Sequence, residues 1–360
     1  MNDLSDGVIR PFNATREGRR GSISEIPANL ANCLSYLRNL SLAILSQGED
    51  IVSDKKMPMR DYQIAQVDVF TDRIFSGNPL AVVLEATGLS DAEMQAIAGE
   101  LPHAPGTTTF VLSATGSGSD ARVRIFTSAC ELPFSGHSMI GTAYVLAARR
   151  PRNRRRLVLE VGIGPVEIEV ERVAGAPQTL WLRQSDPALG AEFPDRRRIA
   201  QALGVAEADL LPGLPIQAVS GGLPFMYVAV RHPDIVDRAA LDLPALLKAA
   251  PEAASLGIFV FAPGPDQGAY RVYSRMFAPH TAGIPEDPAT GAAGGPLAAY
   301  LVRYGIVQAP GEVQIVCEQG TKMGRQSFIH IRLRVQDGEA REVRIGGHVV
   351  PVLDGVLRLP

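Results

Sequence analysis

The stretch Glu131–Gly136 reads Glu-Leu-Pro-Phe-Ser-Gly, and the stretch Glu286–Gly291, 155 positions later, reads Glu-Asp-Pro-Ala-Thr-Gly. Each follows a short strand-like segment that begins with arginine, Arg124–Phe126 in the first case and Arg275–Phe277 in the second. Each is followed by small residues that predict a helix. The pattern strand, Glu-x-Pro-x-Ser/Thr-Gly turn and helix therefore occurs twice, which predicts two homologous lobes whose helix N-termini face each other.

The segments upstream of these turns also correspond. Gly77–Leu80 leads into an apolar strand, as does Gly222–Phe225, at an offset of 145 positions. Thr109–Val111 has a counterpart in Ile258–Val260 at an offset of 149 positions. Gly-x-Pro turns and Phe-Val strands are common, so one such match would mean little. Several matches in the same order, with roughly constant spacing, favour a duplicated architecture.

Composition and pattern divide the chain into four parts. Residues 1–56 begin polar and rich in Arg, Gly and Ser, and we expect them to be poorly ordered apart from one amphipathic helix near 28–46. The first lobe is predicted to cover 60–185 and the second 186–345. Residues 346–360 are predicted to form a C-terminal strand segment. The N-terminal part is either a genuine extension or the product of a start codon placed too far upstream.

Strand-like and helix-like segments alternate along the two lobes. Ser90 and Glu93 have the spacing of a helix capping box. The other expected helices are 138–149, 195–203, 243–250 and 292–304. The expected strands are 62–70, 81–84, 108–113, 121–127, 156–161, 164–172, 178–183, 225–230, 256–262, 270–277, 313–317, 328–335, 342–347 and 356–359. No Gly-x-Gly-x-x-Gly follows a strand and no Walker A sequence occurs, so a dinucleotide or P-loop site is not expected.

Composition excludes several classes of partner. The chain is 46% hydrophobic and 20% charged with a net charge of −3, which fits a globular protein and gives no reason to expect nucleic acid or a membrane surface. We interpret the arginine-rich run 149–156 as a helix C-terminus followed by a solvated loop. Three cysteines without a Cys-x-x-Cys pair argue against a zinc site or a disulfide framework, and they suggest the cytoplasm. A secretory signal is not expected, because the first 25 residues lack an apolar core.

The two turns are the best candidate site. Gly and small residues let a ligand approach the backbone closely, and the first N–H groups of a helix are unpaired donors. Two such helix mouths facing each other would hold a carboxylate or stabilise an enolate-like charge without a metal ion. Each turn taken alone also fits an ordinary helix cap, so the duplication favours a site. The candidate binding residues are Asn78, Ser135, Gly136, Thr290, Gly291, Ala292 and Ala293.

His137 and Asp287 are the ionisable residues at the two mouths. A helix N-terminus lowers the proton affinity of a nearby histidine, so His137 would stay neutral at pH 7 and could relay a proton. Asp287 is either a helix cap or a general acid whose pKa is raised by its neighbour Glu286. We expect His137 and Asp287 to be the catalytic pair.

These residues carry a resemblance to the phenazine-biosynthesis-type isomerases, the PhzF-like family, over about 60–360. The matching segments are Asp68–Asp72, Gly77–Val83, Glu131–His137, Gly283–Gly291, Glu318–Gly320, Met323–Arg325, Gly346–Gly347 and Val349–Val352. The resemblance implies an α+β fold like that of diaminopimelate epimerase, with two pseudo-symmetric lobes. Each lobe would be a central helix wrapped by curved, mostly antiparallel sheet. It also implies an interlobe cleft, no cofactor and a homodimer.

One position departs from the family pattern. A catalytic Glu stands in the family immediately before a strand like Thr108–Val111, and Thr107 occupies that position here. A threonine hydroxyl cannot act as a carboxylate base near pH 7. The preceding loop, 102–106, is about two residues longer than usual. We expect Thr107 to face the cleft, and His103 is an alternative second catalytic group unless it belongs to a surface turn.

The resulting hypothesis is a cofactor-independent isomerase of a small, carboxylate-bearing, partly unsaturated substrate. The related racemases use one thiol per lobe, but the matching positions here are Ser135 and Thr290, which disfavours two-thiol racemisation. Two alternatives remain open. One is a non-catalytic binding protein that lost its base at Thr107, and the other is a related proton-transfer enzyme, such as a dehydratase, that relies on Asp287 alone.

Overall fold

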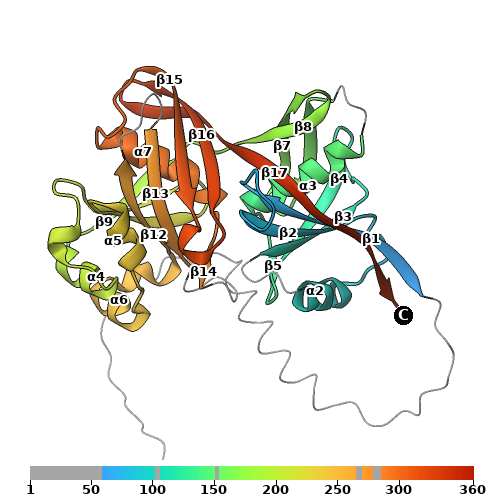
Figure 1. The fold of residues 1–360 in the computed structure, drawn as a ribbon, viewed down its shortest axis with the longest axis horizontal. Helices are drawn as coiled ribbons and strands as arrows, with labels where there is room; N and C mark the ends of the chain where they lie inside the picture. The colour runs from blue at the N-terminus through green and yellow to red at the C-terminus, as the bar shows by residue number, and fades with distance from the viewer. Residues whose placement is uncertain (1–58, 102–105, 151–153, 265–269, 279–284) are drawn as a thin grey trace, which may run out of the picture. The chain divides into compact units, whose positions relative to one another are not determined.

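A computed structural model describes residues 59–101, 106–150, 154–264, 270–278 and 285–360. All of them belong to one compact unit, Met57–Pro360. The helix expected near 28–46 and the candidate His103 lie outside the described residues. Within the unit, two groups of strands each surround one long helix, as Figure 1 shows for α3 (Gly136–Ala148) and α7 (Gly294–Arg303).

The first lobe is built from β1 to β8. Its elements are β1 (Arg60–Val69), β2 (Asn78–Val83), α2 (Asp91–Glu100), β3 (Thr107–Leu112), β4 (Ala121–Phe126), β5 (Glu131–Leu132), α3, β6 (Arg156–Val161), β7 (Gly164–Val173) and β8 (Ala176–Arg183). Helix α3 packs against β1, β2, β3, β6, β7, β8 and the last strand of the chain. A helix enclosed in this way must be apolar all round, and α3 buries eleven of its thirteen residues.

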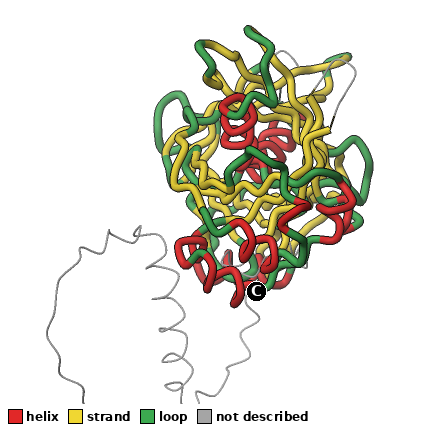
Figure 2. Tube along the Cα trace, turned by 90° about the vertical axis from the view of Figure 1, so that its left-hand side faces the viewer, coloured by secondary structure: helices red, strands yellow, loops and turns green. Residues whose placement is uncertain are grey.

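The second lobe repeats the arrangement. Its elements are β9 (Ala188–Phe193), α4 (Arg196–Ala202), η1 (Glu207–Asp209), β10 (Ile216–Ser220), β11 (Pro224–Ala229), α5 (Pro233–Arg238), α6 (Leu243–Ala249), η2 (Pro251–Ser255), β12 (Gly257–Gly264), β13 (Tyr270–Phe277), β14 (Glu286–Asp287), η3 (Gly291–Ala293), α7, β15 (Gly311–Gln319), η4 (Thr321–Met323), β16 (Ser327–Gln336) and β17 (Glu339–Leu359). Figure 2 shows helical turns enclosed between layers of strands, with other helices outside them.

Strand pairing confirms the duplication predicted from the two turns. Every pairing of β1 to β8 within the first lobe has an equivalent nine strands later. The parallel pairs β2–β3 and β4–β6 correspond to β11–β12 and β13–β15. The antiparallel pairs β3–β4 and β6–β7 likewise correspond to β12–β13 and β15–β16. The predicted two-lobed α+β fold with mostly antiparallel sheets is therefore confirmed.

The equivalent edges of the two lobes are closed by strands from different parts of the chain. In the second lobe β10 pairs with β9, which follows the first lobe in the chain. In the first lobe the same edge, β1, pairs with the far end of β17. Strand β17 pairs in turn with β16, β8 and β1, so it passes from the second lobe into the first (Figure 1). It is one continuous strand where the sequence predicted separate strands at 342–347 and 356–359, because His348 to Gly355 also pair with neighbouring strands.

Several other elements differ from expectation. Strand β10 and helix α5 were not predicted, since β10 has five residues and α5 has six. The helix predicted at 292–304 is divided into the 3-10 turn η3 and α7. The capping box of α2 is confirmed, because the Ser90 side chain accepts from the Glu93 amide and the Glu93 carboxylate accepts from the Ser90 amide. No helix in the described part of the chain is long and apolar enough to cross a membrane.

Candidate active site

The two predicted turns meet face to face. A Cβ atom added to Gly136, the first residue of α3, would lie 3.4 Å from the Ala292 nitrogen and 3.5 Å from the Gly291 carbonyl carbon. A Cβ atom added to Gly291 would lie 2.9 Å from the end of Ile345 and 3.1 Å from the ring of Phe70. A side chain at position 136 would thus just touch the mouth of η3, whereas one at position 291 would crowd Ile345 and Phe70.

A pair of equivalent ion pairs holds the two turns. The Arg124 guanidinium donates two hydrogen bonds to Glu131, each of 2.7 Å. Arg275 donates in the same way to Glu286 at 2.7 and 2.8 Å. Each guanidinium also lies over the phenylalanine ring of its own strand. The arginine at the start of each repeat thus fixes the short strand, β5 or β14, that leads to the helix mouth.

The ionisable residues do not repeat. Phe126 pairs with Glu131 as Phe277 pairs with Glu286, and this register makes Leu132 the counterpart of Asp287. His137 follows the first turn, where the second turn has an alanine. One lobe supplies the imidazole and the other supplies the carboxylate, so the duplicated fold forms one asymmetric site.

Asn78, at the start of β2, joins the two groups. Its fully buried amide nitrogen donates to Asp287 Oδ1 at 2.7 Å and to the Ala289 carbonyl oxygen at 3.0 Å, and it lies 3.3 Å from His137 Nδ1. Its side-chain oxygen is buried and has no hydrogen-bond partner among the described residues. Since Asn78 belongs to the first lobe and Asp287 to the second, this amide connects the lobes at the site.

The turn before Asn78 is fixed by a buried ion pair. Gly77 has a φ of +69°, and a Cβ atom there would lie 2.3 Å from the Val69 carbonyl oxygen. Arg325, from the second lobe, donates to the carbonyl oxygens of Gly77 and Ser76, each at 3.0 Å, and to the buried carboxylate of Asp68 at 2.5 Å. These contacts position Asn78 between the lobes.

Asp287 accepts hydrogen bonds at both carboxylate oxygens. Thr290 Oγ1 donates to Oδ2 at 2.8 Å, and the Ala289 amide donates to Oδ1 at 3.3 Å. Gln319 Nε2 donates to the Asp287 carbonyl oxygen at 2.6 Å and to Thr290 Oγ1 at 2.9 Å. Burial raises the pKa of Asp287 and outweighs these hydrogen bonds, which lower it. Glu286, expected to be the main cause, contributes least, since Arg275 pairs with it.

His137 is buried at the start of α3, with 7% of its surface exposed. Burial lowers the pKa of His137 to about 3, so the ring is neutral at physiological pH. Its Nε2 lies 2.9 Å from Thr107 Oγ1, which in turn lies 2.7 Å from Ser138 Oγ. Thr107 therefore lies against the first turn of α3. Among the described residues, its hydrogen-bonded connection to Asp287 runs through His137 and Asn78.

The remaining predicted binding residues lie at the two mouths. They differ in whether their polar groups already have hydrogen-bond partners within the protein. Ser135 Oγ lies 3.3 Å from His137 Nδ1. The Ala293 amide donates to the Thr290 carbonyl oxygen and its own carbonyl accepts from Tyr227, so both backbone groups of Ala293 are occupied. The candidate ligand-binding amides are thus those of Gly136, Gly291 and Ala292, at positions where a helix lacks internal partners.

Four site residues were not expected in these roles from the sequence. Ser138 and Gln319 contact Thr107 and Thr290, respectively. Gln184 accepts from the Gly295 amide at 2.6 Å and so caps α7. Gln319 and Arg325 lie in segments that the family resemblance included, which is the only signal that pointed to them. A lone polar residue on a buried strand or helix gives no periodic pattern, so Ser138 and Gln184 could not be found.

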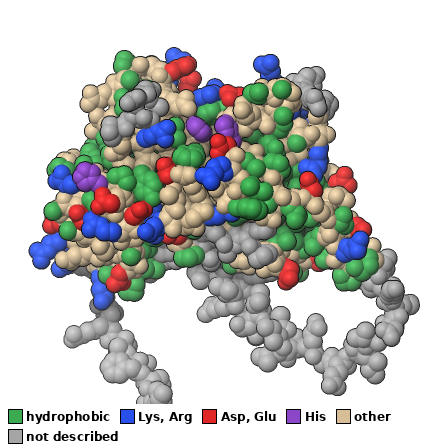
Figure 3. All heavy atoms as spheres, in the orientation of Figure 1, with side chains coloured by type: hydrophobic (Ala, Val, Ile, Leu, Met, Phe, Trp, Pro, Cys, Tyr) green, Lys and Arg blue, Asp and Glu red, His purple; other side chains and the backbone are tan. Residues whose placement is uncertain are grey.

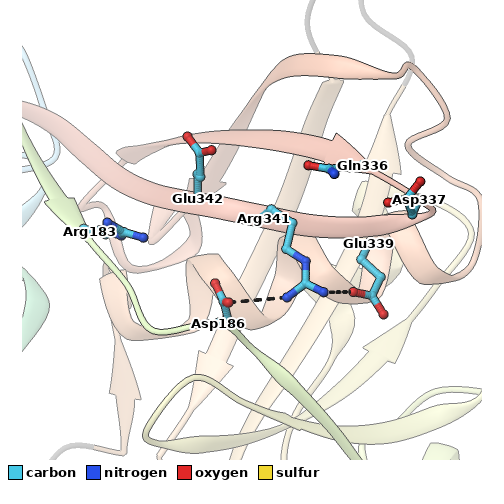
Figure 4. A pocket seen from close by; sticks show the side chains of 7 residues that line it. All are labelled: Arg183, Asp186, Gln336, Asp337, Glu339, Arg341 and Glu342. Carbon is cyan, nitrogen blue, oxygen red and sulfur yellow. Dashed lines mark hydrogen bonds and ion pairs between the residues drawn. The ribbon is translucent and has the colours of Figure 1, made fainter.

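A surface pocket in the described part of the chain is lined mainly by charged side chains. It has a volume of about 280 Å³ and is lined by Arg183 at the end of β8 together with Asp186, Gln336, Asp337, Glu339, Arg341 and Glu342 (Figure 4). Arg341 already pairs with Asp186 and Glu339, and carboxylates outnumber guanidinium groups, so the pocket does not suit an anion. Figure 3 shows basic and acidic side chains intermixed over the visible face. Within the described ranges, no group of three or more His, Cys, Asp or Glu is arranged to hold a metal ion.

Known proteins resemble this chain in sequence over most of its length. The family model described as phenazine biosynthesis-like protein matches residues 67–355. A trans-2,3-dihydro-3-hydroxyanthranilate isomerase of Pseudomonas chlororaphis is 34% identical over 297 residues, which cover 81% of this chain and 98% of the relative. An uncharacterized isomerase of Mesorhizobium japonicum is 36% identical over 318 residues, with 84% and 99% covered.

Solved structures show the same fold. A phenazine biosynthesis protein of the PhzF family from Bacillus anthracis superposes with a TM-score of 0.74 at 26% identity, covering 83% of this chain and 99% of that one. A hydroxyproline epimerase from Agrobacterium vitis superposes with a TM-score of 0.56 at 15% identity, covering 83% and 93%, which shows likeness of fold alone. The sequence and structural matches span nearly the whole length of these proteins.

Proposed function

Because this chain belongs to the phenazine biosynthesis-like protein family, we propose that it is a cofactor-independent isomerase that moves a proton, and with it a double bond, on a small carboxylate-bearing substrate. The relatives from Pseudomonas chlororaphis and Mesorhizobium japonicum are both named as isomerases, which supports the general class. The finer proposal rests on the site residues of this chain. Its substrate is expected to be partly unsaturated, since a proton on a carbon next to a double bond and a carboxylate can leave as an enolate-like anion.

One observation carries the proposal: Asp287 and His137 come from different lobes and meet at the amide of Asn78. The pKa of Asp287 is raised by burial, so its carboxyl holds a proton more readily than a solvated one. The pKa of His137 is lowered to about 3, so its ring is neutral. A carboxyl that can donate and an imidazole that can accept are the two groups that proton transfer between carbon atoms requires.

The two helix mouths support a carboxylate as the substrate's recognition group. The amides of Gly136, Gly291 and Ala292 lie at helix N-termini that approach within van der Waals distance. The hydroxyl of Ser135 lies beside His137 Nδ1. Helix N-termini attract negative charge through unpaired N–H groups, so a carboxylate bound there would lie next to both catalytic groups. The same donors would stabilise the charge that forms when the carbon loses its proton.

Solvent deuterium incorporation tests the proposal. The protein is incubated in D₂O with trans-2,3-dihydro-3-hydroxyanthranilate, the compound in the name of the Pseudomonas chlororaphis relative, and then with other small unsaturated acids. We expect deuterium at carbon in the product. Asp287→Asn keeps the shape of the side chain and should lower the rate by on the order of 10²–10⁴, as is typical for a lost acid or base.

Glu286→Gln is the matched control for Asp287→Asn. It neutralises the adjacent carboxylate, whose partner is Arg275 rather than a site residue. We expect its rate to remain near that of the wild type, although its melting temperature should fall. Equal rates for Asp287→Asn and the wild type would contradict the proposal and leave Asp287 a structural residue of the turn.

Thr107 favours a second candidate, a binding protein without catalysis. The family resemblance expects a carboxylate at this position, and Thr107 supplies only a hydroxyl that contacts His137 and Ser138. A protein of this kind would bind the same acids and give no deuterium at carbon. A dehydratase would instead release water in the same incubation, so mass spectrometry of the product separates the three possibilities.

We also propose that the protein is a cytoplasmic homodimer. The family resemblance supports the dimer, and the absence of a Cys-x-x-Cys pair fits a reducing compartment. Light scattering coupled to size-exclusion chromatography measures the mass directly. A single species at the mass of one chain across the working concentration range would contradict the dimer.

A further inference from the structure

Four side chains form a closed circuit of hydrogen bonds around the imidazole of His137. Nε2 lies 2.9 Å from Thr107 Oγ1, and Thr107 Oγ1 lies 2.7 Å from Ser138 Oγ. Ser138 Oγ donates to Ser135 Oγ at 2.8 Å, and Ser135 Oγ lies 3.3 Å from His137 Nδ1. Each of the three hydroxyls has one hydrogen to donate, and the neutral ring has one N–H. Every member can therefore donate once and accept once.

The direction of one bond fixes all the others. Ser138 gives its hydrogen to Ser135, so it can only accept from Thr107. Thr107 gives its hydrogen to Ser138 and therefore presents a lone pair to His137 Nε2. Nε2 must then carry the ring proton, and Nδ1 must have the lone pair, to which Ser135 can donate.

Asn78 indicates the same tautomer independently. Its amide nitrogen lies 3.3 Å from Nδ1 and has no lone pair with which to accept, while its two hydrogens are directed at Asp287 Oδ1 and the Ala289 carbonyl oxygen. An N–H on Nδ1 would therefore face a nitrogen that cannot accept it. The nitrogen that faces Asn78, and through it Asp287, is therefore the basic one.

We propose that Ser138 is a positioning residue that sets the tautomer of His137, acting through Thr107 and Ser135, and so directs the basic nitrogen of the ring toward the interlobe site. Ser138 is fully buried, and its hydroxyl is linked to the His137 ring through the hydroxyls of Thr107 and Ser135. In its absence Thr107 would have no acceptor other than Nε2 within the circuit. The Thr107 hydroxyl would then donate to the ring, and the ring proton would move to Nδ1, where Ser135 can accept it.

The chain contains a matched control one turn further along α3. Thr142 Oγ1 lies 2.8 Å from Thr109 Oγ1, and both residues are fully buried between the same helix and the same strand as Ser138 and Thr107. Neither Thr142 nor Thr109 hydrogen-bonds to a histidine in the described part of the chain. Thr142→Ala therefore removes a buried hydroxyl from the same helix–strand contact without altering the circuit.

Nitrogen NMR of the full chain, labelled with ¹⁵N-histidine, tests the proposal. The two ring nitrogens of a neutral histidine have widely different chemical shifts according to which one carries the proton. The chain has six histidines, and the signals lost in His137→Gln identify those of His137. The spectra are recorded at pH 7 without substrate for the wild type, Ser138→Ala, Thr107→Ser and Thr142→Ala.

We expect the wild type, Thr107→Ser and Thr142→Ala to hold the proton on Nε2. In Ser138→Ala the Nδ1–H population should rise about tenfold, which corresponds to about 1.4 kcal/mol, the contribution of one neutral hydrogen bond. A wild-type ring protonated on Nδ1 would overturn the proposal. So would a Ser138→Ala spectrum with the wild-type tautomer. If Ser138→Ala does not fold, Thr107→Val serves instead, because it removes the acceptor of Nε2–H and should also move the proton to Nδ1.

The tautomer that Ser138 is proposed to set does not depend on the proposed function. Only the use of His137 as a base rests on that function. The tautomer is measured without substrate, so a protein that turns over no acid would refute the proposed function and leave the role of Ser138 intact. Conversely, an active enzyme whose Ser138→Ala variant keeps the Nε2–H tautomer would refute the role of Ser138 alone.

Discussion

The imidazole of His137 is buried in its neutral form, which affects the stability of the protein. Its pKa is lowered to about 3 by burial, whereas a histidine in the unfolded chain titrates at 6.5. The unfolded chain therefore binds a proton between these pH values when the folded chain does not. The stabilising effect of the neutral ring is fully present above pH 6.5 and is lost as the pH falls toward 3.

This predicts a measurable difference between the wild type and His137→Gln. In urea unfolding, the free energy of unfolding of the wild type should fall relative to that of the variant by about 1.4 kcal/mol per pH unit below 6.5, hence by about 2 kcal/mol at pH 5. The raised pKa of Asp287 has the opposite effect on the pH dependence of the free energy of unfolding. Because Asp287 is present in both proteins, this effect largely cancels when the two are compared. Parallel curves between pH 7.5 and 5 would show that His137 is not buried in its neutral form.

At the scale of single residues, the sequence predicted that His137 and Asp287 lie near each other, but it did not predict the hydrogen bonds that connect the site residues. His137 follows one of the two repeated turns and Asp287 lies within the other, so both residues lie where the two turns meet. Whether Asp287 contacts Asn78 depends on the register of β14 against β13, and a two-residue strand has no sequence pattern. The contact of Ser138 with Thr107 depends on how α3 is rotated against β3, which apolar periodicity cannot fix when nearly all of α3 is buried.

Among the elements of the fold, the turn between β1 and β2 is the one that places a site residue between the lobes. Its conformation depends on the positive φ of Gly77 and on the bond from Arg325 to Asp68. The chain contains a second glycine with nearly the same φ, Gly213 at +74°, whose added Cβ atom would meet nothing within 4 Å. Alanine substitutions at Gly77 and Gly213 therefore separate two losses of stability, one from the left-handed backbone conformation and one from the close contact of the added Cβ atom.

We predict that Gly77→Ala is much more harmful than Gly213→Ala. Both variants incur left-handed strain of about 1–2 kcal/mol, but only Gly77→Ala also forces its Cβ atom to 2.3 Å from the Val69 carbonyl oxygen. We expect Gly77→Ala to lose on the order of 3 kcal/mol or more of stability and, if folded, to lose deuterium exchange activity because Asn78 moves. Chemical unfolding of both variants measures this, and equal losses would contradict the expectation.

Most elements were predictable from the sequence, and the exceptions have physical reasons. Strand β13 was predicted at Tyr270–Phe277, its observed bounds, because apolar and polar residues alternate along a half-buried strand. Helix α5 was missed because it begins with Pro233 and has six residues, too few for a helical period to be recognised. The continuity of β17 was missed because Gly346, Gly347 and Gly355 resemble turns, although they lie in a strand.

At the scale of the whole molecule, the strand pairings of the described residues join segments between Arg60 and Leu359. Strand β1 begins at Arg60 and pairs with β2 and β17, so it needs no partner from the first 56 residues. The division predicted at 60–185 and 186–345 stays a prediction, although β1 pairs with Val349–Leu359, so the first range alone does not hold a complete sheet.

We therefore predict that deleting residues 1–56 changes the melting temperature by only a few degrees, about the effect of 1 kcal/mol or less. Circular dichroism of the full chain and the truncated chain measures this. A deletion that continues to residue 69 removes β1 and should abolish folding, which provides the control. A fall of 10 °C or more in the shorter deletion, well beyond the shift that such a small change allows, would show that the first 56 residues contribute to the fold.

The path of β17 has a consequence for how the protein is made. Residues Val349–Leu359 complete the sheet that begins with Arg60–Val69, so the first lobe to leave the ribosome is the one that needs the last residues to be translated. Domains usually fold in the order in which they are synthesised, but here the first lobe cannot complete its sheet before the end of the chain has been made. Once Arg183 has been added, the nascent first lobe must wait with the edge of β1 unpaired while nearly 180 further residues are added. Such an edge can pair with other chains, so the newborn protein is expected to depend on chaperones until its final strand is released.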